Sequence, residues 1–199
     1  EVSNVTAIAT GWTHVCVILS DGKVKCWGDN STGQLGDGTT TTSIAPVEVK
    51  GISNAVAISV HIGHTCVVLS TGAVKCWGTD SVQSGKIGEI IYSFNSTTPI
   101  EIRGISNAIS IASGRNHTCA LLSDGTVKCW GSNIYGQLGS TKVASADTLL
   151  KASLVGAWSA TPLEAEGIQN AISISAGMFR TCALLKNGTV KCCGVKLQP

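Results

Sequence analysis

The chain has 199 residues, which is ample for one sizeable hydrophobic core, and a formal net charge of +2. This charge is too small and too scattered to favour nucleic acid or an anionic membrane as a partner, and no apolar run approaches the roughly 18 residues that span a bilayer. Hydrophobic residues make up 43% of the chain and charged residues only 13%, with 23 glycines. This composition is typical of a turn-rich all-β protein and not of a disordered chain.

One unit occurs four times along the chain. Each copy opens with small and β-branched residues, which predict strands at Val5–Thr10, Ala55–Val60, Ala108–Ser113 and Ala171–Ala176. A tight loop follows, then two runs of β-forming residues around a polar turn that ends in glycine, and then a polar connection.

Three of the units close with a further strand, which we expect to begin at a proline (Pro46, Pro99 and Pro162). Proline cannot donate a hydrogen bond to a central ladder, so these strands should lie at sheet edges. Four strands in a unit of 50 to 63 residues are typical of the blades of a β-propeller. The one moderate helix candidate is Asp147–Val155.

The two runs inside each unit predict a β-hairpin with a cysteine near the far end of each strand. In the third copy, a three-residue turn with Gly125 in the left-handed conformation places Cys119 directly opposite Cys129, at a separation that a disulfide tolerates. All four copies keep this spacing. We therefore predict four intra-hairpin disulfides: Cys16–Cys26, Cys66–Cys76, Cys119–Cys129 and Cys182–Cys192. Cys193 remains as a ninth cysteine, unpaired or bonded to another chain.

Paired cysteines favour an oxidising compartment and hence an extracellular or cell-surface location. Zinc is the competing interpretation, but the chain has no Cys-x-x-Cys or Cys/His cluster of the usual spacing, and the vicinal Cys192-Cys193 is not one. We expect no metal and no cofactor.

Five asparagines open Asn-x-Ser/Thr sequons and are candidate glycosylation sites: Asn4, Asn30, Asn95, Asn116 and Asn187. Asn30 and Asn95 lie in polar connections and are expected to be accessible. Asn116 lies in the tight loop before His117, where attachment of a glycan should be hindered.

The motifs of the third unit resemble the regulator of chromosome condensation repeat. They read Ile111-Ala112-Ser113-Gly114-x-x-His117-Thr118, then Asp124-Gly125-x-Val127-x-x-Trp130-Gly131, then Gly136-Gln137-Leu138-Gly139. The resemblance covers nearly the whole chain and implies a β-propeller, usually of seven blades. The paired cysteines resemble the variant found in secreted and surface proteins of microbes.

We therefore expect one propeller-type domain over residues 1–199, either an open arc or part of a larger propeller. Its repeats should span about 1–50, 51–103 and 104–166, with a partial repeat at 167–199. Two repeats depart from the family pattern. The second carries His61 in place of a glycine and Gly85-Lys86-Ile87-Gly88 in place of the Gly-Gln-Leu-Gly motif, and the fourth carries Arg180 for the histidine and Cys193 for the tryptophan.

No recurrent residue predicts catalysis. His14, His64 and His117 recur at one position, which indicates a structural hydrogen bond, since a catalytic histidine would be singular. Trp27, Trp77 and Trp130 should fill the wedges between blades. Trp12 lies in a loop similar to those of plant ultraviolet photoreceptors of this family, but one such loop does not support light sensing. No phosphate loop, nucleophile elbow or acid pair is present, so we expect no enzyme.

Four lysines recur before the second cysteine of each hairpin: Lys25, Lys75, Lys128 and Lys191. Their stems should pack along the blades, and a ring of ammonium groups that binds an anion is the alternative. The connections Thr79–Thr98 and Ser140–Thr161 carry unusual apolar side chains, which form a candidate binding face: Ile90, Ile91, Tyr92, Phe94 and Trp158. The alternative is that these side chains fold back over the blade edges.

The leading functional hypothesis is a secreted or cell-surface, non-catalytic propeller that acts as a binding or structural module. Its partner would be another protein or further copies of itself, assembled into an extracellular filament with Cys193 near the junction. The resemblance implies two alternatives. One is guanine-nucleotide exchange on a small GTPase together with chromatin binding, and the other is inhibition of an enzyme by loops on one face.

Overall fold

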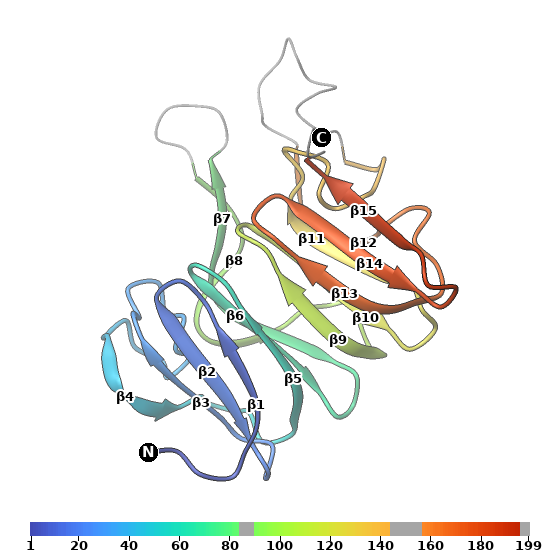
Figure 1. Ribbon diagram of the computed structural model, residues 1–199. Helices are drawn as coiled ribbons and strands as arrows, with labels where there is room; N and C mark the ends of the chain where they lie inside the picture. Colours follow the sequence, from blue (N-terminus) through green and yellow to red (C-terminus); the bar gives the residue numbers. More distant parts are fainter. Residues whose placement is uncertain (84–89, 144–156, 196–199) are drawn as a thin grey trace. The chain divides into compact units, whose positions relative to one another are not determined.

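The computed structural model describes residues 1–83, 90–143 and 157–195 (Figure 1), and for residues 80–94 only the backbone elements are described. All regular elements in the described residues are β-strands, and they form four antiparallel sheets. The described residues contain no helix long and apolar enough to cross a membrane. The predicted all-β blade architecture is therefore confirmed.

Each sheet is one blade, with its strands side by side in chain order. Blade 1 contains β1 (Val5–Thr10), β2 (His14–Leu19), β3 (Val24–Gly28) and β4 (Ser43–Glu48). Blade 2 contains β5 (Ala55–Val60), β6 (His64–Leu69), β7 (Val74–Gln83) and β8 (Ile90–Glu101). Blade 3 contains β9 (Ala108–Ser113), β10 (His117–Leu122), β11 (Val127–Ser132) and β12 (Trp158–Glu164). Blade 4 has three described strands, β13 (Ala171–Ala176), β14 (Arg180–Leu185) and β15 (Val190–Gly194).

The chain divides into two compact units. One consists of Glu1–Asp80 and Phe94–Ile111, and the other of Ser81–Ser93 and Ala112–Pro199. Each unit has its own hydrophobic core between neighbouring blades, built around Ile18, Leu35 and Trp77 in the first and around Leu121, Leu138 and Ile168 in the second.

The central hairpins have the predicted three-residue turn. In blade 3, Gly125 has a φ of 81° and donates its N–H to the carbonyl of Leu122, whose own N–H bonds to Thr126. This left-handed conformation suits glycine, because it has no β-carbon to clash. The turn sets the register, and Cys119 lies opposite Cys129 as predicted.

The closing strands differ from the prediction in where they begin. β4 starts at Ser43 and β12 at Trp158, so Pro46 and Pro162 lie inside their strands. Each strand is at a sheet edge, as expected, and its pairing is interrupted by a bulge that contains the proline. The Ser43 hydroxyl donates to the carbonyl of Ala45 at 2.7 Å and so closes the bulge. The bulge lets proline occupy a strand interior because no ladder bond is required there.

The connection in the second repeat also differs from the prediction. The sequence predicts a connection over Thr79–Thr98, but β7 continues to Gln83 and β8 begins at Ile90. The apolar residues Ile90–Phe94 therefore belong to a strand, which agrees with their high β-propensity. The candidate helix Asp147–Val155 lies outside the described residues.

Candidate functional site

A disulfide crosses each of the four central hairpins, as the register predicts. The bonds join Cys16 to Cys26, Cys66 to Cys76, Cys119 to Cys129, and Cys182 to Cys192. Their Cα atoms are 4.0–4.1 Å apart, which is the close spacing of directly opposed strand residues. In blades 1 to 3 both cysteines are fully buried, so these bonds are part of the core.

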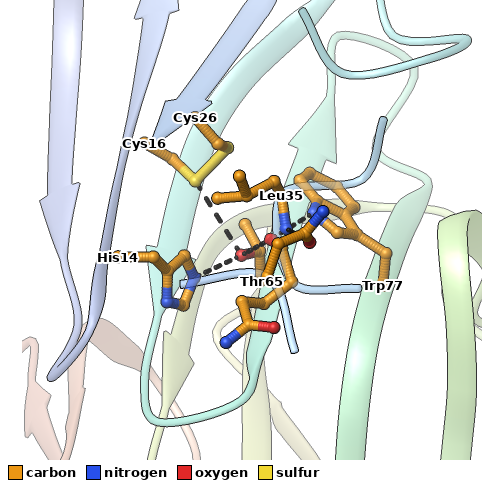
Figure 2. Close-up of a disulfide and its surroundings, with 8 residues drawn as sticks. His14, Cys16, Cys26, Leu35, Thr65 and Trp77 are labelled. Atoms are coloured by element: carbon orange, nitrogen blue, oxygen red, sulfur yellow. Dashed lines mark hydrogen bonds between the residues drawn. A yellow bond between two sulfur atoms is a disulfide. The ribbon is translucent and has the colours of Figure 1, made fainter. Parts of the chain in front are cut away.

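The first repeated site is the joint between neighbouring blades, shown for blades 1 and 2 in Figure 2. Its centre is the hydroxyl of Thr65, which donates to the carbonyl of Gln34 at 2.9 Å. Because its single proton is used in that bond, its oxygen accepts from Nε2 of His14 at 2.8 Å. This assigns the Nε2-protonated tautomer to His14. The indole N–H of Trp77 donates to the same Gln34 carbonyl at 2.8 Å.

The joint between blades 3 and 4 repeats the histidine–threonine pair. His117 Nε2 lies 2.9 Å from the Thr181 hydroxyl, and both residues are fully buried. In each case the threonine directly precedes a disulfide cysteine of the following blade. These contacts show that His14 and His117 tie one blade to the next, which is the structural role that the sequence indicates.

Burial in this joint lowers the pKa of His14 from 6.5 to about 4, and the negative charge of Asp29 opposes the shift. The folded protein therefore keeps this ring neutral, whereas the unfolded chain protonates it near pH 6.5. Since the unfolded state binds more protons between these two values, stability falls as the pH is lowered through them. We expect His14 to account for a loss of about 2.5 kcal/mol in the free energy of unfolding between pH 7 and pH 4.5.

Urea unfolding of the wild type and of His14→Gln at both pH values measures this contribution. Glutamine cannot take up a proton, so the variant should lose less stability on acidification than the wild type. Equal losses in the two proteins would show that His14 does not titrate in this way. All other titrating groups affect both proteins equally, so their effect cancels when the two losses of stability are compared.

The connections after the first and third hairpins are each built on a buried asparagine, which sequence reasoning did not identify. Asn30 is fully buried, accepts the N–H of Leu35 at 2.9 Å, and donates its amide to Asp37, Thr39 and Thr41. Asn133 accepts the N–H of Leu138 at 2.9 Å in the same way. The signal was the shared Asn-x-x-Gly-Gln-Leu-Gly spacing in both repeats.

The prediction that Asn30 is an accessible glycosylation site is therefore wrong, because its amide nitrogen is buried and fully engaged in hydrogen bonds. Asn4, Asn95 and Asn187 are exposed, and Asn116 is half-buried. Glycosylation at these four positions stays a prediction.

We expect a folded, secreted form of the chain to carry glycans at Asn187 and Asn95 and none at Asn30. A glycan on Asn30 would prevent its connection from folding, so molecules that carry one should be retained or degraded. Glycopeptide mapping of the secreted protein measures the occupancy. An Asn30 peptide found largely glycosylated would contradict the buried position.

Cys193 is a free, half-buried cysteine that stands in place of the tryptophan of the other repeats. A β-carbon built on Gly139 would lie 2.6 Å from its sulfur, just as one on Gly36 would lie 2.6 Å from the Trp77 indole. Burial raises the pKa of the Cys193 thiol, which lowers its reactivity. This position, in the joint between blades 3 and 4, favours a packing role.

Two of the recurrent lysines bond to the loop that precedes their blade. Lys75 donates to the carbonyl of Gly51 at 3.4 Å and Lys191 to that of Gly167 at 2.7 Å. Their ammonium groups are therefore already engaged. This agrees with lysine stems that pack along the blades.

A second feature is a group of large side chains on the loops of the second unit, which we call the Tyr135 cluster: Arg115, Tyr135, Met178 and Phe179. The Tyr135 and Phe179 rings have centroids 4.6 Å apart, and the Arg115 guanidinium lies 5.8 Å from the centroid of Phe179. Tyr135 is 46% exposed and Met178 39%. Tyrosine, arginine and methionine are enriched at protein–protein interfaces.

Sequence reasoning missed this cluster and placed the candidate binding face elsewhere. Ile90, Ile91, Tyr92 and Phe94 lie where side chains are outside the described residues, and Trp158 is half-buried at the start of β12. The available signal was the variable pair in each Gly-x-x-His loop, which holds Arg115 in one repeat and Met178 and Phe179 in the next.

One family model of the regulator of chromosome condensation (RCC1) repeat matches residues 5–34, 108–137 and 171–195. A second model of the same repeat matches residues 21–68. Together these matches cover more than half of the chain. The chain belongs to the RCC1 repeat family.

Among curated RCC1 relatives, the chain is 27% identical over 203 residues to protein pim1 of Schizosaccharomyces pombe, which covers 96% of this chain and 37% of pim1. Among solved structures it resembles Prp20p of Saccharomyces cerevisiae, with a TM-score of 0.73, 22% identity, and coverage of 95% of this chain and 44% of Prp20p. It also resembles the ectodomain of the Arabidopsis thaliana receptor kinase ACR4, with a TM-score of 0.55, 20% identity, and coverage of 98% and 55%. The chain thus spans less than half of pim1 and Prp20p.

RCC1-type relatives bind protein partners. Prp20p has been studied for its binding to Gsp1p and histones, and a second structure shows it bound by Kap60. Within this RCC1 chain, the fourth repeat departs from the histidine of the other repeats. Arg180 replaces the histidine and its guanidinium donates to the carbonyl of Val195, so it is held in its own blade.

Proposed function

We propose that this chain is a secreted or cell-surface, non-catalytic member of the RCC1 repeat family that acts as a protein-binding or structural module. The observation that carries the proposal is a disulfide at the same register position of every hairpin. Such bonds persist in an oxidising compartment and are rare in the cytosol and nucleus. Likeness to the ACR4 ectodomain supports an RCC1-like fold in an extracellular setting.

Two further observations support binding without chemistry. The recurrent histidines His14 and His117 are buried and bonded to threonines, so they are not presented to a substrate. The Tyr135 cluster offers exposed side chains of the kind that protein interfaces favour. Binding of protein partners by Prp20p gives a precedent in the family.

Counting free thiols in the protein from its natural source tests the location. The protein is denatured and alkylated without reduction, and its mass is then compared with that of a reduced sample. An extracellular chain should show one alkylated thiol, Cys193, out of the nine cysteines. Nine alkylated thiols would contradict the proposal and favour the intracellular alternative.

That alternative, guanine-nucleotide exchange, is tested with Gsp1p as the probe. We expect this chain to leave the rate of nucleotide release from Gsp1p unchanged, with full-length Prp20p as the positive control. Acceleration by this chain would replace the binding-module proposal with the exchange function. Inhibition of an enzyme is the remaining alternative and needs a screen against secreted hydrolases.

Self-assembly into a filament is a second candidate, and exposed apolar side chains on blade 4 favour it. Leu184 is 37% exposed and Val190 62%, whereas the equivalent residues of the other blades are buried. Unpaired strand edges with apolar neighbours promote association between chains. Sedimentation velocity under non-reducing conditions should then show species larger than the 20.4 kDa monomer, and a single monomer peak at all concentrations would exclude it.

A further inference from the structure

The Tyr135 cluster brings an arginine and two aromatic rings together on three loops of the second unit. Phe179, in the loop between β13 and β14, contacts both partners. Its ring centroid lies 4.6 Å from that of Tyr135, in the connection after β11, and 5.8 Å from the guanidinium carbon of Arg115, in the loop between β9 and β10. The backbone N–H of Arg115 also donates to the carbonyl of Met178 at 3.4 Å, which links two of these loops. The three side chains therefore form one surface.

Arg115 and Tyr135 are exposed although the joint beside them is complete. Both belong to blade 3, and blade 4 closes that joint. Tyr135 is 46% exposed, and Arg115 is exposed as well. The equivalent of Tyr135 in blade 1 is Thr32, a half-buried residue whose hydroxyl lies 3.1 Å from the carbonyl oxygen of Gly63 in blade 2. In blade 3 a large ring thus replaces a small side chain of the joint, and nearly half of its surface remains in solvent.

The guanidinium of Arg115 is held against a ring while its hydrogen-bond donors stay unused. Among the residues that the structure describes, no carboxylate lies within ion-pair distance of Arg115. A guanidinium carries five N–H donors in a planar fork, and this fork binds a carboxylate through two parallel hydrogen bonds. The contact with Phe179 is a cation–π interaction, which restricts the position of the fork. Less side-chain entropy is therefore lost when a carboxylate binds.

The charge of the three loops favours an acidic ligand. Segments 114–117, 133–136 and 177–180 contain two arginines, Arg115 and Arg180, and no aspartate or glutamate. Arg180 donates to a backbone carbonyl of its own blade, so Arg115 is the arginine of these loops with unused donors. An exposed positive group without a neighbouring carboxylate attracts a negatively charged partner.

The two rings determine what accompanies the carboxylate. Tyr135 and Phe179 are inclined at 50° to each other and Phe179 is half-buried, so the pair does not form the flat, open platform on which a sugar ring stacks. The exposed part of Tyr135 suits an apolar side chain, and its hydroxyl is a donor and acceptor for a peptide backbone. The two distances to the Phe179 ring add to about 10 Å, which is roughly three residues of an extended chain. The carboxylate and the apolar side chain should therefore be close neighbours in the ligand.

We propose that Arg115, Tyr135 and Phe179 bind an acidic segment of a partner protein, in which an aspartate or glutamate lies within about three residues of an apolar side chain. This deepens the binding role and rests on the proposed function of a protein-binding module. Arg115 binds the carboxylate through two N–H groups, Tyr135 packs against the apolar side chain, and Phe179 holds both in place. Tyrosine and arginine are among the residues that contribute most of the binding energy at protein interfaces.

The probe is a short, fluorescently labelled random copolymer of glutamate and tyrosine, which contains every spacing of a carboxylate and an apolar ring. It is titrated into the whole chain at physiological ionic strength and followed by anisotropy, and we expect saturable binding. Arg115→Gln should weaken binding about tenfold or more, since it removes the charge and the fork. Tyr135→Ala should weaken it several-fold. Arg103→Gln and Trp12→Ala, at another exposed arginine and another exposed aromatic residue, are the matched controls and should leave binding unchanged.

Two further probes separate the classes of ligand. Polyglutamate carries the charge without the apolar side chains and should bind several-fold more weakly than the copolymer. Alginate, an acidic polysaccharide, should bind no better than polyglutamate. Far-ultraviolet circular dichroism checks that the variants are folded, as substitutions at exposed positions should be.

The inference fails if the copolymer shows no saturable binding, or if Arg115→Gln or polyglutamate binds as well as the wild-type pair. Alginate that binds more tightly than the copolymer would show that an acidic glycan is the ligand, which also overturns the inference. One free thiol per chain without copolymer binding would overturn this inference alone. Nine free thiols together with Arg115-dependent binding would overturn the extracellular role alone.

Discussion

Reducing the four disulfides should unfold the chain. Each bond joins residues 10 positions apart, and closing a loop of that length stabilises the folded state by about 3 kcal/mol in the chain-entropy model. The sum for four bonds is similar to the whole free energy of unfolding of an ordinary domain, about 5–15 kcal/mol. Circular dichroism during thermal unfolding, with and without a strong reductant, measures the effect.

Single-bond variants make the prediction quantitative. Replacing Cys16 and Cys26 together by alanine should lower the free energy of unfolding by about 3 kcal/mol. Cys193→Ala, which removes the thiol that forms no disulfide, is the control and should change stability far less. A reduced chain that keeps its full cooperative transition would show that the blades do not depend on these bonds.

Trp77→Ala should be among the most destabilising single substitutions, with a loss of about 3–5 kcal/mol. Trp77 is fully buried, packs against Gly36 in the joint between blades 1 and 2, and donates to the carbonyl of Gln34. The substitution leaves a cavity the size of an indole at that joint. Chemical denaturation monitored by circular dichroism measures the loss, since Trp fluorescence is itself changed by the substitution.

Two further variants separate the causes. Trp77→Phe keeps an aromatic ring and removes the N–H donor and part of the ring volume, so it should cost less than the alanine variant. Trp12→Ala removes a tryptophan that is 67% exposed and should change stability by less than about 0.5 kcal/mol. Similar losses for Trp12→Ala and Trp77→Ala would contradict the assignment of Trp77 to the core.

Local features of the fold could be read from the sequence because the chain sets them over a few residues. The turn that contains Gly125 fixes the register of its hairpin, and that register fixes the pairing of Cys119 with Cys129. The starts of β4 and β12 could not be read in this way. Their first residues precede a bulge, and a bulge leaves no regular alternation in the sequence.

The candidate sites were less predictable, since they depend on residues far apart in the chain. The position of His14 indicated a hydrogen bond, but its partner Thr65 is 51 residues away and could not be named. Asn30 lies in a glycosylation sequon, but in the structure its side chain is buried and accepts a hydrogen bond from the backbone of its own connection. The Tyr135 cluster joins side chains from three loops, none of which has an unusual composition alone.

The histidine–threonine pair of each joint has a consequence for how such a chain can change in length. The first and third repeats supply the histidine and the second and fourth supply the threonine, as His14 with Thr65 and His117 with Thr181 show, and the sequence carries His64 and Thr118 at the equivalent positions of the second and third repeats. Deleting residues 51–103 would bring the repeat of His14 next to the one that carries Thr118. Duplication or deletion of a whole repeat that carries both residues therefore places a histidine opposite a threonine at the new junction. A break within a repeat does not.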